Sequence, residues 1–203
     1  MGYFRNTGQP DWDWWSKLWP APGETLRALG IREGNSVAEI CCGNGYFALP
    51  AARIVDPDPV YAVDVDDSLL SELAELADLQ RIENLVPIHG DVRRLASLLP
   101  ERVDVIVLAN SFHGIDDHEG VLQEVVESLR EGGRFVVVNW HDQPREETIV
   151  SGVPRGPPTD LRLSPAETER IVVEAVPLEA VERVDLPPYH YGIVFERYRD
   201  WGR

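Results

Sequence analysis

Short apolar runs alternate with amphipathic stretches through the middle of the chain. Continuous apolar runs are typical of parallel strands covered on both faces, and apolar residues at helical spacing predict a helix lying on the sheet. Predicted strands end near residue 38 and then span residues 60–65, 85–89, 103–109 and 134–140. Predicted helices lie between them at residues 46–55, 68–80, 93–99 and 117–131. This alternation predicts an α/β fold built on a mostly parallel sheet.

The beginning of the chain departs from this alternation. Four of the six tryptophans fall in an N-terminal arm, residues 1–22, as Trp12, Trp14, Trp15 and Trp19. So short a segment cannot bury all four side chains, and we expect some of them to cover a ligand cleft. Packing onto the domain and contact with a partner are the alternatives. A short helix is predicted next, over residues 24–29.

The last third of the chain begins with a long irregular segment. Residues 141–163 are rich in proline and glycine and are long enough to form a functional loop or lid. Ser164 and Glu167 then form a capping box, which starts a helix reaching to about residue 176. Two final strands are predicted at residues 178–186 and 191–198. Since no linker or internal repeat separates these parts, we expect residues 1–203 to form a single domain.

Two glycines follow the first predicted strand and precede the first helix of the alternating region. Gly43 and Gly45 lie in the sequence Glu-Ile-Cys-Cys-Gly-Asn-Gly-Tyr. Glycine tolerates positive φ and has no Cβ, so the backbone there can approach a nucleotide-sized ligand beside a helix N-terminus. An ordinary tight turn between strand and helix would look the same, so the acids that follow are needed to decide. Asp64 ends the second strand and Asp91 follows the third.

This order of acids and glycines resembles the class I S-adenosylmethionine-dependent methyltransferases over roughly residues 26–140. The resemblance implies that the turn lines the methionine end of the cofactor, that Asp64 binds the ribose and that Asp91 with Val92 contacts the adenine. Cys41 stands where the family often has a further glycine. The residues expected to bind S-adenosylmethionine are Glu39, Cys41, Gly43, Gly45, Asp64, Val65, Asp91, Val92 and Asn110.

The resemblance also completes the expected fold and function. The family ends in a hairpin with an antiparallel last strand. The expected fold is therefore α/β and doubly wound, with a mostly parallel seven-stranded sheet, an antiparallel last strand and helices on both faces. The expected activity is methyl transfer from S-adenosylmethionine to a small-molecule acceptor.

Two other functions stay open at this point. Residues 43–48 also fit the Gly-x-Gly-x-x-Gly/Ala pattern of NAD(P)-dependent oxidoreductases, with Asp64 as that pattern's acid. Glu39 within the first strand, the Gly90-Asp91 pair and the antiparallel end of the sheet weigh against an oxidoreductase. A non-catalytic cofactor-binding protein that uses the tryptophan-rich arm for interactions is the third possibility.

Charge and composition limit the classes of partner that the protein is expected to bind. The net charge of −16 repels phosphate backbones, so nucleic acid is not an expected partner. No apolar run reaches membrane-spanning length and the N-terminus lacks the apolar core of a signal peptide, so we expect a cytoplasmic protein with no membrane partner. Cys41 and Cys42 are adjacent and argue neither for a framework disulfide nor for a metal site. A homodimer is left open.

Acceptor chemistry is expected at the carboxyl edge of the sheet, where ligands bind in folds of this kind. Asn110 and His113 follow the fourth strand, His141 follows the fifth, and Tyr189 and His190 precede the last strand. His113 and His190 are the candidate catalytic residues, because histidine can accept a proton near neutral pH from a hydroxyl or carbon acid. A local hydrogen-bonding role is the alternative for each. Without a carboxylate or cysteine at ligand spacing, no metal site is expected.

Overall fold

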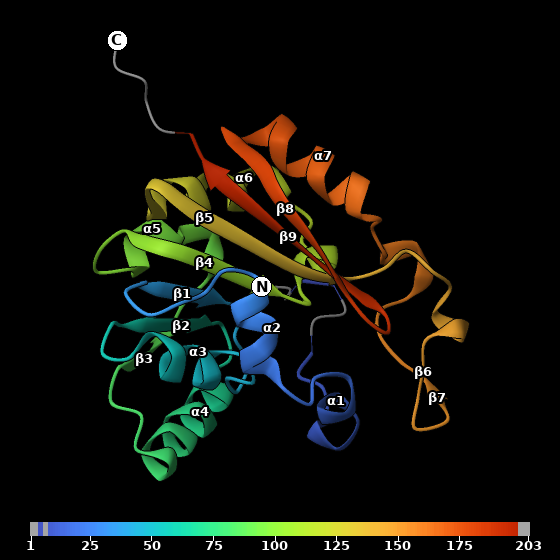
Figure 1. Ribbon diagram of the computed structural model, residues 1–203, viewed down its shortest axis with the longest axis horizontal. Coiled ribbons are helices and arrows are strands. Elements are labelled where there is room, and N and C mark those ends of the chain that lie inside the picture. The colour runs from blue at the N-terminus through green and yellow to red at the C-terminus, as the bar shows by residue number, and fades with distance from the viewer. Residues whose placement is uncertain (1–3, 6–7, 199–203) are drawn as a thin grey trace.

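The computed structural model of the protein describes residues 4–5 and 8–198, and within them seven strands form one twisted sheet (Figure 1). The strands lie in the order β3-β2-β1-β4-β5-β9-β8, and β9 is antiparallel to both of its neighbours. The bounds are β1 Val37–Ile40, β2 Val60–Asp64, β3 Leu85–His89, β4 Val103–Ala109, β5 Leu129–Trp140, β8 Leu178–Leu186 and β9 His190–Arg197. This arrangement confirms the predicted α/β, doubly wound sheet with an antiparallel last strand.

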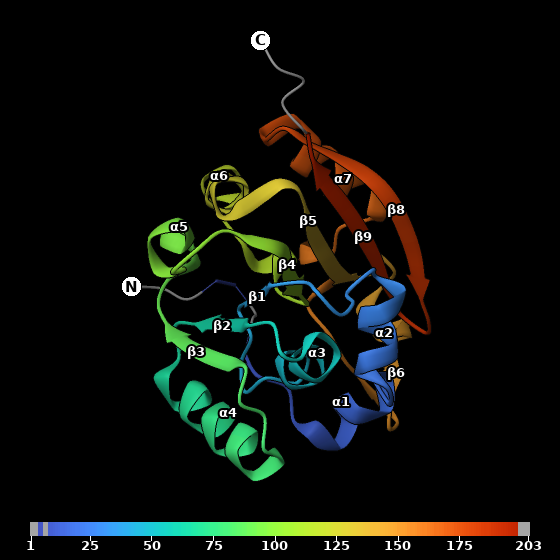
Figure 2. The same cartoon turned by 60° about the vertical axis from the view of Figure 1, so that its left-hand side comes forward.

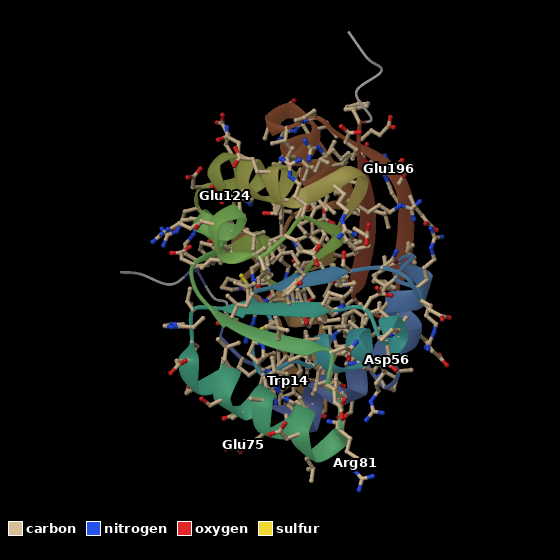
Figure 3. All side chains as sticks on the ribbon, turned by 90° about the vertical axis from the view of Figure 1, so that its left-hand side faces the viewer. Trp14, Asp56, Glu75, Arg81, Glu124 and Glu196 are labelled. Atoms are coloured by element: carbon tan, nitrogen blue, oxygen red, sulfur yellow. The ribbon has the colours of Figure 1, made fainter. Side chains whose placement is uncertain are left out.

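Helices cover both faces of the sheet, as Figure 2 shows. They are α1 Trp12–Leu18, α2 Pro22–Ala28, α3 Ala48–Val55, α4 Asp67–Gln80, α5 Leu95–Leu98, α6 His118–Ser128 and α7 Pro165–Ala175. Side chains alternate along a strand, so Val105 and Val107 of β4 pack toward α1 to α4, whereas Ile106 and Leu108 pack toward α5 to α7. Outside these two cores, Glu75 and Arg81 of the α4 region point away from the sheet (Figure 3).

The boundary between α6 and β5 differs from the prediction. The helix was expected to reach residue 131, but α6 ends at Ser128 and β5 begins at Leu129. Leu129 is fully buried and pairs with Val103, and Arg130 donates to Asp104 and Glu101. These contacts with the start of β4 draw the chain into the sheet five residues before the predicted strand start at residue 134. Tertiary pairing therefore overrides a helical pattern of apolar residues here.

The segment 141–163 also holds structure that the sequence did not predict. It contains a small antiparallel hairpin, β6 Ile149–Val150 and β7 Val153–Pro154, between single turns of 3-10 helix. The hairpin lies beside α1, so the N-terminal arm and this segment meet near the carboxyl edge of the sheet (Figures 1 and 2). No helix among the described residues is long and apolar enough to cross a membrane.

Candidate functional site

The turn after β1 adopts the conformation that favours glycine. Gly43 has φ 55° and Gly45 has φ 85°, and Cys41 has φ 58° although it carries a Cβ. A left-handed conformation costs a residue other than glycine roughly 1–2 kcal/mol. A Cβ at Gly45 would lie 2.2 Å from Leu73 Cδ1, so α4 packs directly on the turn. With Cys41 at this position, the backbone thus follows the same path that a glycine would follow.

A cavity of about 1030 Å³ opens above this turn at the carboxyl ends of β1, β2, β3 and β4. Its volume is at the upper end of the roughly 300–1,000 Å³ of small-molecule sites, which leaves room for a cofactor and an acceptor together. Eight of the nine predicted cofactor residues line it: Glu39, Cys41, Gly43, Asp64, Val65, Asp91, Val92 and Asn110. Gly45 lies behind the wall, where it allows the close approach of Leu73.

Glu39 places a buried carboxylate on the wall of the cavity. Its side chain is 4% exposed, and Oε2 has no hydrogen-bond partner within residues 4–5 and 8–198. Burial, together with the nearby charge of Asp64, raises the pKa of Glu39 well above its ordinary value. An uncompensated buried carboxylate is costly, and a cationic ligand group beside it would offset that cost. This wall is therefore suited to an ammonium group.

Asp64 braces the turn from the end of β2. Its Oδ2 accepts from the backbone N–H of Gly43 at 2.8 Å, and its Oδ1 accepts from the N–H of Asp66 at 3.0 Å. Each carboxylate oxygen can accept a second hydrogen bond, so both remain able to receive hydroxyl donors from a ligand. Asp66 instead caps α4, where its side chain accepts from the N–H groups of Ser68 and Leu69.

Asp91 and Val92 line the far end of the cavity in different ways. The Asp91 carboxylate pairs with Arg93, which lowers the pKa of Asp91. Its Oδ1 also accepts from the N–H of Arg93 at the start of a 3-10 turn. Val92 is 2% exposed and presents an apolar wall. This end can hold a flat, weakly polar ring beside one acid that is already paired.

Asn110 follows β4 and reaches the same cavity. It has φ 59°, and its backbone N–H donates to Val138 at 2.7 Å. Both side-chain amide atoms are buried and make no hydrogen bond to any described residue. A buried amide without partners costs roughly 1–3 kcal/mol, so a ligand that donates and accepts there would be stabilised.

His113 is the one member of the predicted histidine group that reaches the cavity wall within the described chain. It is 5% exposed, and its Nδ1 lies 3.1 Å from Asn139 Oδ1. This contact fixes the orientation of the imidazole ring. Asn139, which has this orienting role, was not among the predicted residues, since it lies inside β5.

His141 and His190 do not line the cavity as His113 does, although the charges of His141 and His113 both act on His190. His190 is 1% exposed and packs against Trp140 and Trp19, with ring centroids 4.1 and 4.5 Å away. Burial lowers its pKa well below the ordinary value. His141 faces Asp185 at 3.4 Å, away from the cavity. His190 pairs directly with Trp140, but the rings of Trp15, Trp19 and Trp140 cover it, so a position at the carboxyl edge does not by itself expose a side chain to the cavity.

Further residues that the sequence did not assign complete the wall. They come from the arm, from the end of β5 and from segment 141–163, and are chiefly Gln9, Trp14, Trp15, Trp140, Arg155 and Gly156. Gln9 Oε1 accepts from the N–H of Asn44 at 3.3 Å, and Trp12 Nε1 donates to Asn44 Oδ1 at 3.1 Å. Trp12 is 39% exposed, whereas the other three arm tryptophans are buried. Trp14 and Trp15 therefore both pack on the domain and line the cavity, whereas Trp12 and Trp19 do not line it.

In this doubly wound sheet, the antiparallel β9 lies between β5 and β8. The sheet and its acidic, glycine-lined cavity together define a nucleotide-cofactor fold of the methyltransferase type. The family model and the fold both support the resemblance to the class I S-adenosylmethionine-dependent methyltransferases. Residues 37–133 match the family model described as a methyltransferase domain.

Individual relatives are distant. The demethylmenaquinone methyltransferase of Bacillus mycoides (strain KBAB4) is 22% identical over 114 residues, which cover 56% of this chain and 48% of the relative. That of Listeria welshimeri is 23% identical over 118 residues, covering 57% and 49%. The chain thus matches about half the length of these relatives.

Solved structures resemble the chain over most of its length. A SAM-dependent methyltransferase from Aquifex aeolicus superposes with a TM-score of 0.76 at 21% identity, covering 89% of this chain and 92% of that one. The glycopeptide N-methyltransferase MtfA, complexed with S-adenosyl-L-homocysteine, gives a TM-score of 0.66 at 15% identity, with 87% and 85% covered. At this level of identity the likeness concerns the fold.

Proposed function

We propose that the protein transfers a methyl group from S-adenosylmethionine to a small-molecule acceptor. The observation that carries the proposal is the buried carboxylate of Glu39, whose Oε2 has no hydrogen-bond partner among the described residues and which lies on a glycine-lined cavity. The cofactor's α-ammonium group would supply the missing partner. Its ribose hydroxyls would bind Asp64, and its adenine would lie against Val65 and Val92.

The cofactor would supply an activated methyl group, and the protein's part is mainly to position donor and acceptor. Displacement at a sulfonium proceeds in line and its leaving group needs no proton, so close alignment supplies much of the rate. Trp14, Trp15 and Trp140 would exclude water from the acceptor side. The acids on the cofactor side suit a ligand that carries positive charge at its sulfur and at its amino group.

We assign His113 as the base for acceptors that must lose a proton. His113 lines the cavity, and its contact with Asn139 through Nδ1 orients the imidazole ring. A hydroxyl or carbon acid would need this step, whereas a thiol or neutral amine would not. His113 is therefore proposed as a base, and its contribution should depend on the acceptor.

The acceptor is proposed to be small. The curated relatives are named demethylmenaquinone methyltransferases, which makes a ring-containing acceptor a reasonable starting point. The net charge of −16 disfavours a nucleic acid acceptor. A cytoplasmic location and either a monomeric or a homodimeric state are part of the same proposal.

The two other candidate functions make different predictions. An NAD(P)-dependent oxidoreductase would bind a dinucleotide at the same glycine turn, but the antiparallel β9 between β5 and β8 disfavours it. A non-catalytic protein would bind the cofactor without turning it over. A rise of the melting temperature with S-adenosylmethionine and not with NAD(P) would distinguish the first alternative, and methyl transfer to a panel of metabolites would distinguish the second.

The central test is calorimetry of cofactor binding to an Asp64→Ala variant. Loss of hydrogen bonds from ribose hydroxyls to a charged group should weaken binding by about 1.5–3 kcal/mol. Asp67→Ala is the matched control, because Asp67 is an exposed acid three residues further along on α4. No binding by the parent protein, or equal affinity in both variants, would contradict the proposal.

A further inference from the structure

Arg155 brings a positive charge to the acceptor side of the cavity. Its guanidinium lies over the ring of Trp14, with Cζ 4.8 Å from the centroid. Its Nε is buried without a hydrogen-bond partner, and no ion pair joins Arg155 to a carboxylate of the described residues. A buried guanidinium nitrogen without an acceptor costs free energy. A group outside the chain is the natural partner.

The backbone that carries Arg155 is fixed by a buried network. Its N–H donates to Thr148 O at 2.9 Å, and its carbonyl accepts from Thr148 Oγ1 at 2.7 Å and from Arg162 Nη2 at 3.0 Å. The next residue, Gly156, has φ 86°, and a Cβ there would lie 2.9 Å from the indole of Trp140. The segment is thus held against Trp140 by contacts that do not use the Arg155 side chain. That side chain is positioned, yet its polar atoms are not all satisfied.

Charge divides the cavity into two halves. The cofactor half carries the acids Glu39, Asp64, Asp66 and Asp91, the last of them paired with Arg93. The other half is formed by the three tryptophans Trp14, Trp15 and Trp140 together with Arg155 and one acid, Asp11, at the start of α1. A second cation, Arg162, lies behind the Trp140 ring at 5.2 Å from its centroid. Burial, with repulsion from Arg145, lowers the pKa of Arg162 to about 10, so it stays charged near neutral pH.

We propose that the acceptor is a planar aromatic carboxylate, whose ring packs among Trp14, Trp15 and Trp140 while its carboxylate pairs with Arg155. This inference rests on the proposed methyltransferase function and specifies its substrate class. Planar rings pack well on indoles, and a guanidinium matches a carboxylate in a bidentate geometry. One guanidinium balances one carboxylate, whereas a phosphate would add a second negative charge to a cavity already rich in acids.

The test compares two probes of equal shape on protein loaded with S-adenosylhomocysteine. The probes are 2-naphthoate, which is anionic, and 2-naphthamide, which is neutral. Calorimetry should give at least about ten-fold tighter binding of 2-naphthoate by the parent protein, and Arg155→Gln should remove that preference while leaving 2-naphthamide unaffected. Arg102→Gln is the matched control, because Arg102 is exposed, lies before β4 and loses the same charge; it should behave as the parent.

The outcomes separate the two proposals. If S-adenosylhomocysteine does not bind, the proposed function itself fails. If it binds, but the parent protein binds the two probes equally, or binds neither, the inference about Arg155 is wrong. An equal loss for both probes in Arg155→Gln would also overturn it, because that result would mean that Arg155 only supports the wall. Circular dichroism and the melting temperature of each variant verify that folding is retained.

Discussion

Replacing Glu39 by glutamine should make the protein more stable and its cofactor affinity weaker. Glutamine keeps the shape of the side chain and removes the buried charge. The unfolded chain titrates Glu39 near 4.5, whereas burial and Asp64 raise the pKa of this group in the folded protein. The folded state therefore holds the proton more tightly than the unfolded state. The stability that this tighter proton binding contributes is complete below pH 4.5, and it is lost as the pH rises through the raised pKa of folded Glu39.

The expected magnitude follows from this linkage. The span from 4.5 to pH 7, at roughly 1.4 kcal/mol per pH unit, limits the destabilisation by Glu39 at pH 7 to about 3 kcal/mol. For a chain of this size roughly 2–4 °C corresponds to 1 kcal/mol, so the melting temperature of Glu39→Gln should rise by at most on the order of 10 °C. The gain should shrink toward pH 4.5, where the carboxyl group becomes protonated in both states.

Cofactor binding should change in the opposite direction. Loss of a charged hydrogen-bond partner for the α-ammonium group should weaken the binding of S-adenosylhomocysteine by about 1.5–3 kcal/mol. An analogue that lacks the α-amino group should bind the parent and Glu39→Gln equally. Thermal melts across pH and calorimetry with both ligands measure the two effects, and Glu33→Gln, which alters an exposed acid, is the control.

An unchanged melting temperature at about pH 8 would refute the argument that Glu39 is a buried and uncompensated acid. An equal loss of affinity for both ligands would refute its assignment to the α-ammonium group. Either result is distinguishable from misfolding, because a misfolded variant would lose stability rather than gain it.

Three further predictions address other parts of the site. His113→Ala should lower turnover of a hydroxyl or carbon acid by about 10²- to 10⁴-fold with cofactor affinity nearly unchanged, whereas His190→Ala should chiefly lower the melting temperature. Gly156→Ala should destabilise the protein more than Gly34→Ala in denaturant unfolding. Both glycines have positive φ, but a Cβ at Gly34 would meet open space, whereas a Cβ at Gly156 would meet the Trp140 indole. Equal effects would mean that the contact with the Trp140 indole is unimportant. Cofactor binding should alter the fluorescence of Trp15, which lines the cavity, and a Trp15→Phe variant should lose part of that change.

The order of strands and helices could be predicted because local patterns of apolar and polar residues determine it. Apolar runs and helical spacing depend on near neighbours in the chain, so β2, β3 and β4 lie close to their predicted bounds. The start of β5 could not be placed, because the pairing of Leu129 with Val103 joins residues far apart in sequence. The hairpin of β6 and β7 lies in a stretch without periodicity, and tertiary packing decides its shape.

The sequence by itself placed the residues of the proposed cofactor half at the cavity. Ligands in such sheets lie at the carboxyl ends of strands, so an acid or a glycine at a strand end points to the cavity through topology alone. This is why Glu39, Gly43, Asp64 and Asp91 were found before their contacts were known. Even Cys41 keeps the left-handed backbone of the turn.

The acceptor half was decided by the tertiary structure. Trp140 and His190 are directly paired across β5 and β9, yet Trp140 lines the cavity and His190 is enclosed among indole rings. Arg155 reaches the wall because Thr148 and Arg162 hold its backbone, and neither contact leaves a local trace in the sequence. Side-chain direction and loop placement depend on packing between segments that are distant in sequence. The pattern of neighbouring residues does not contain this packing.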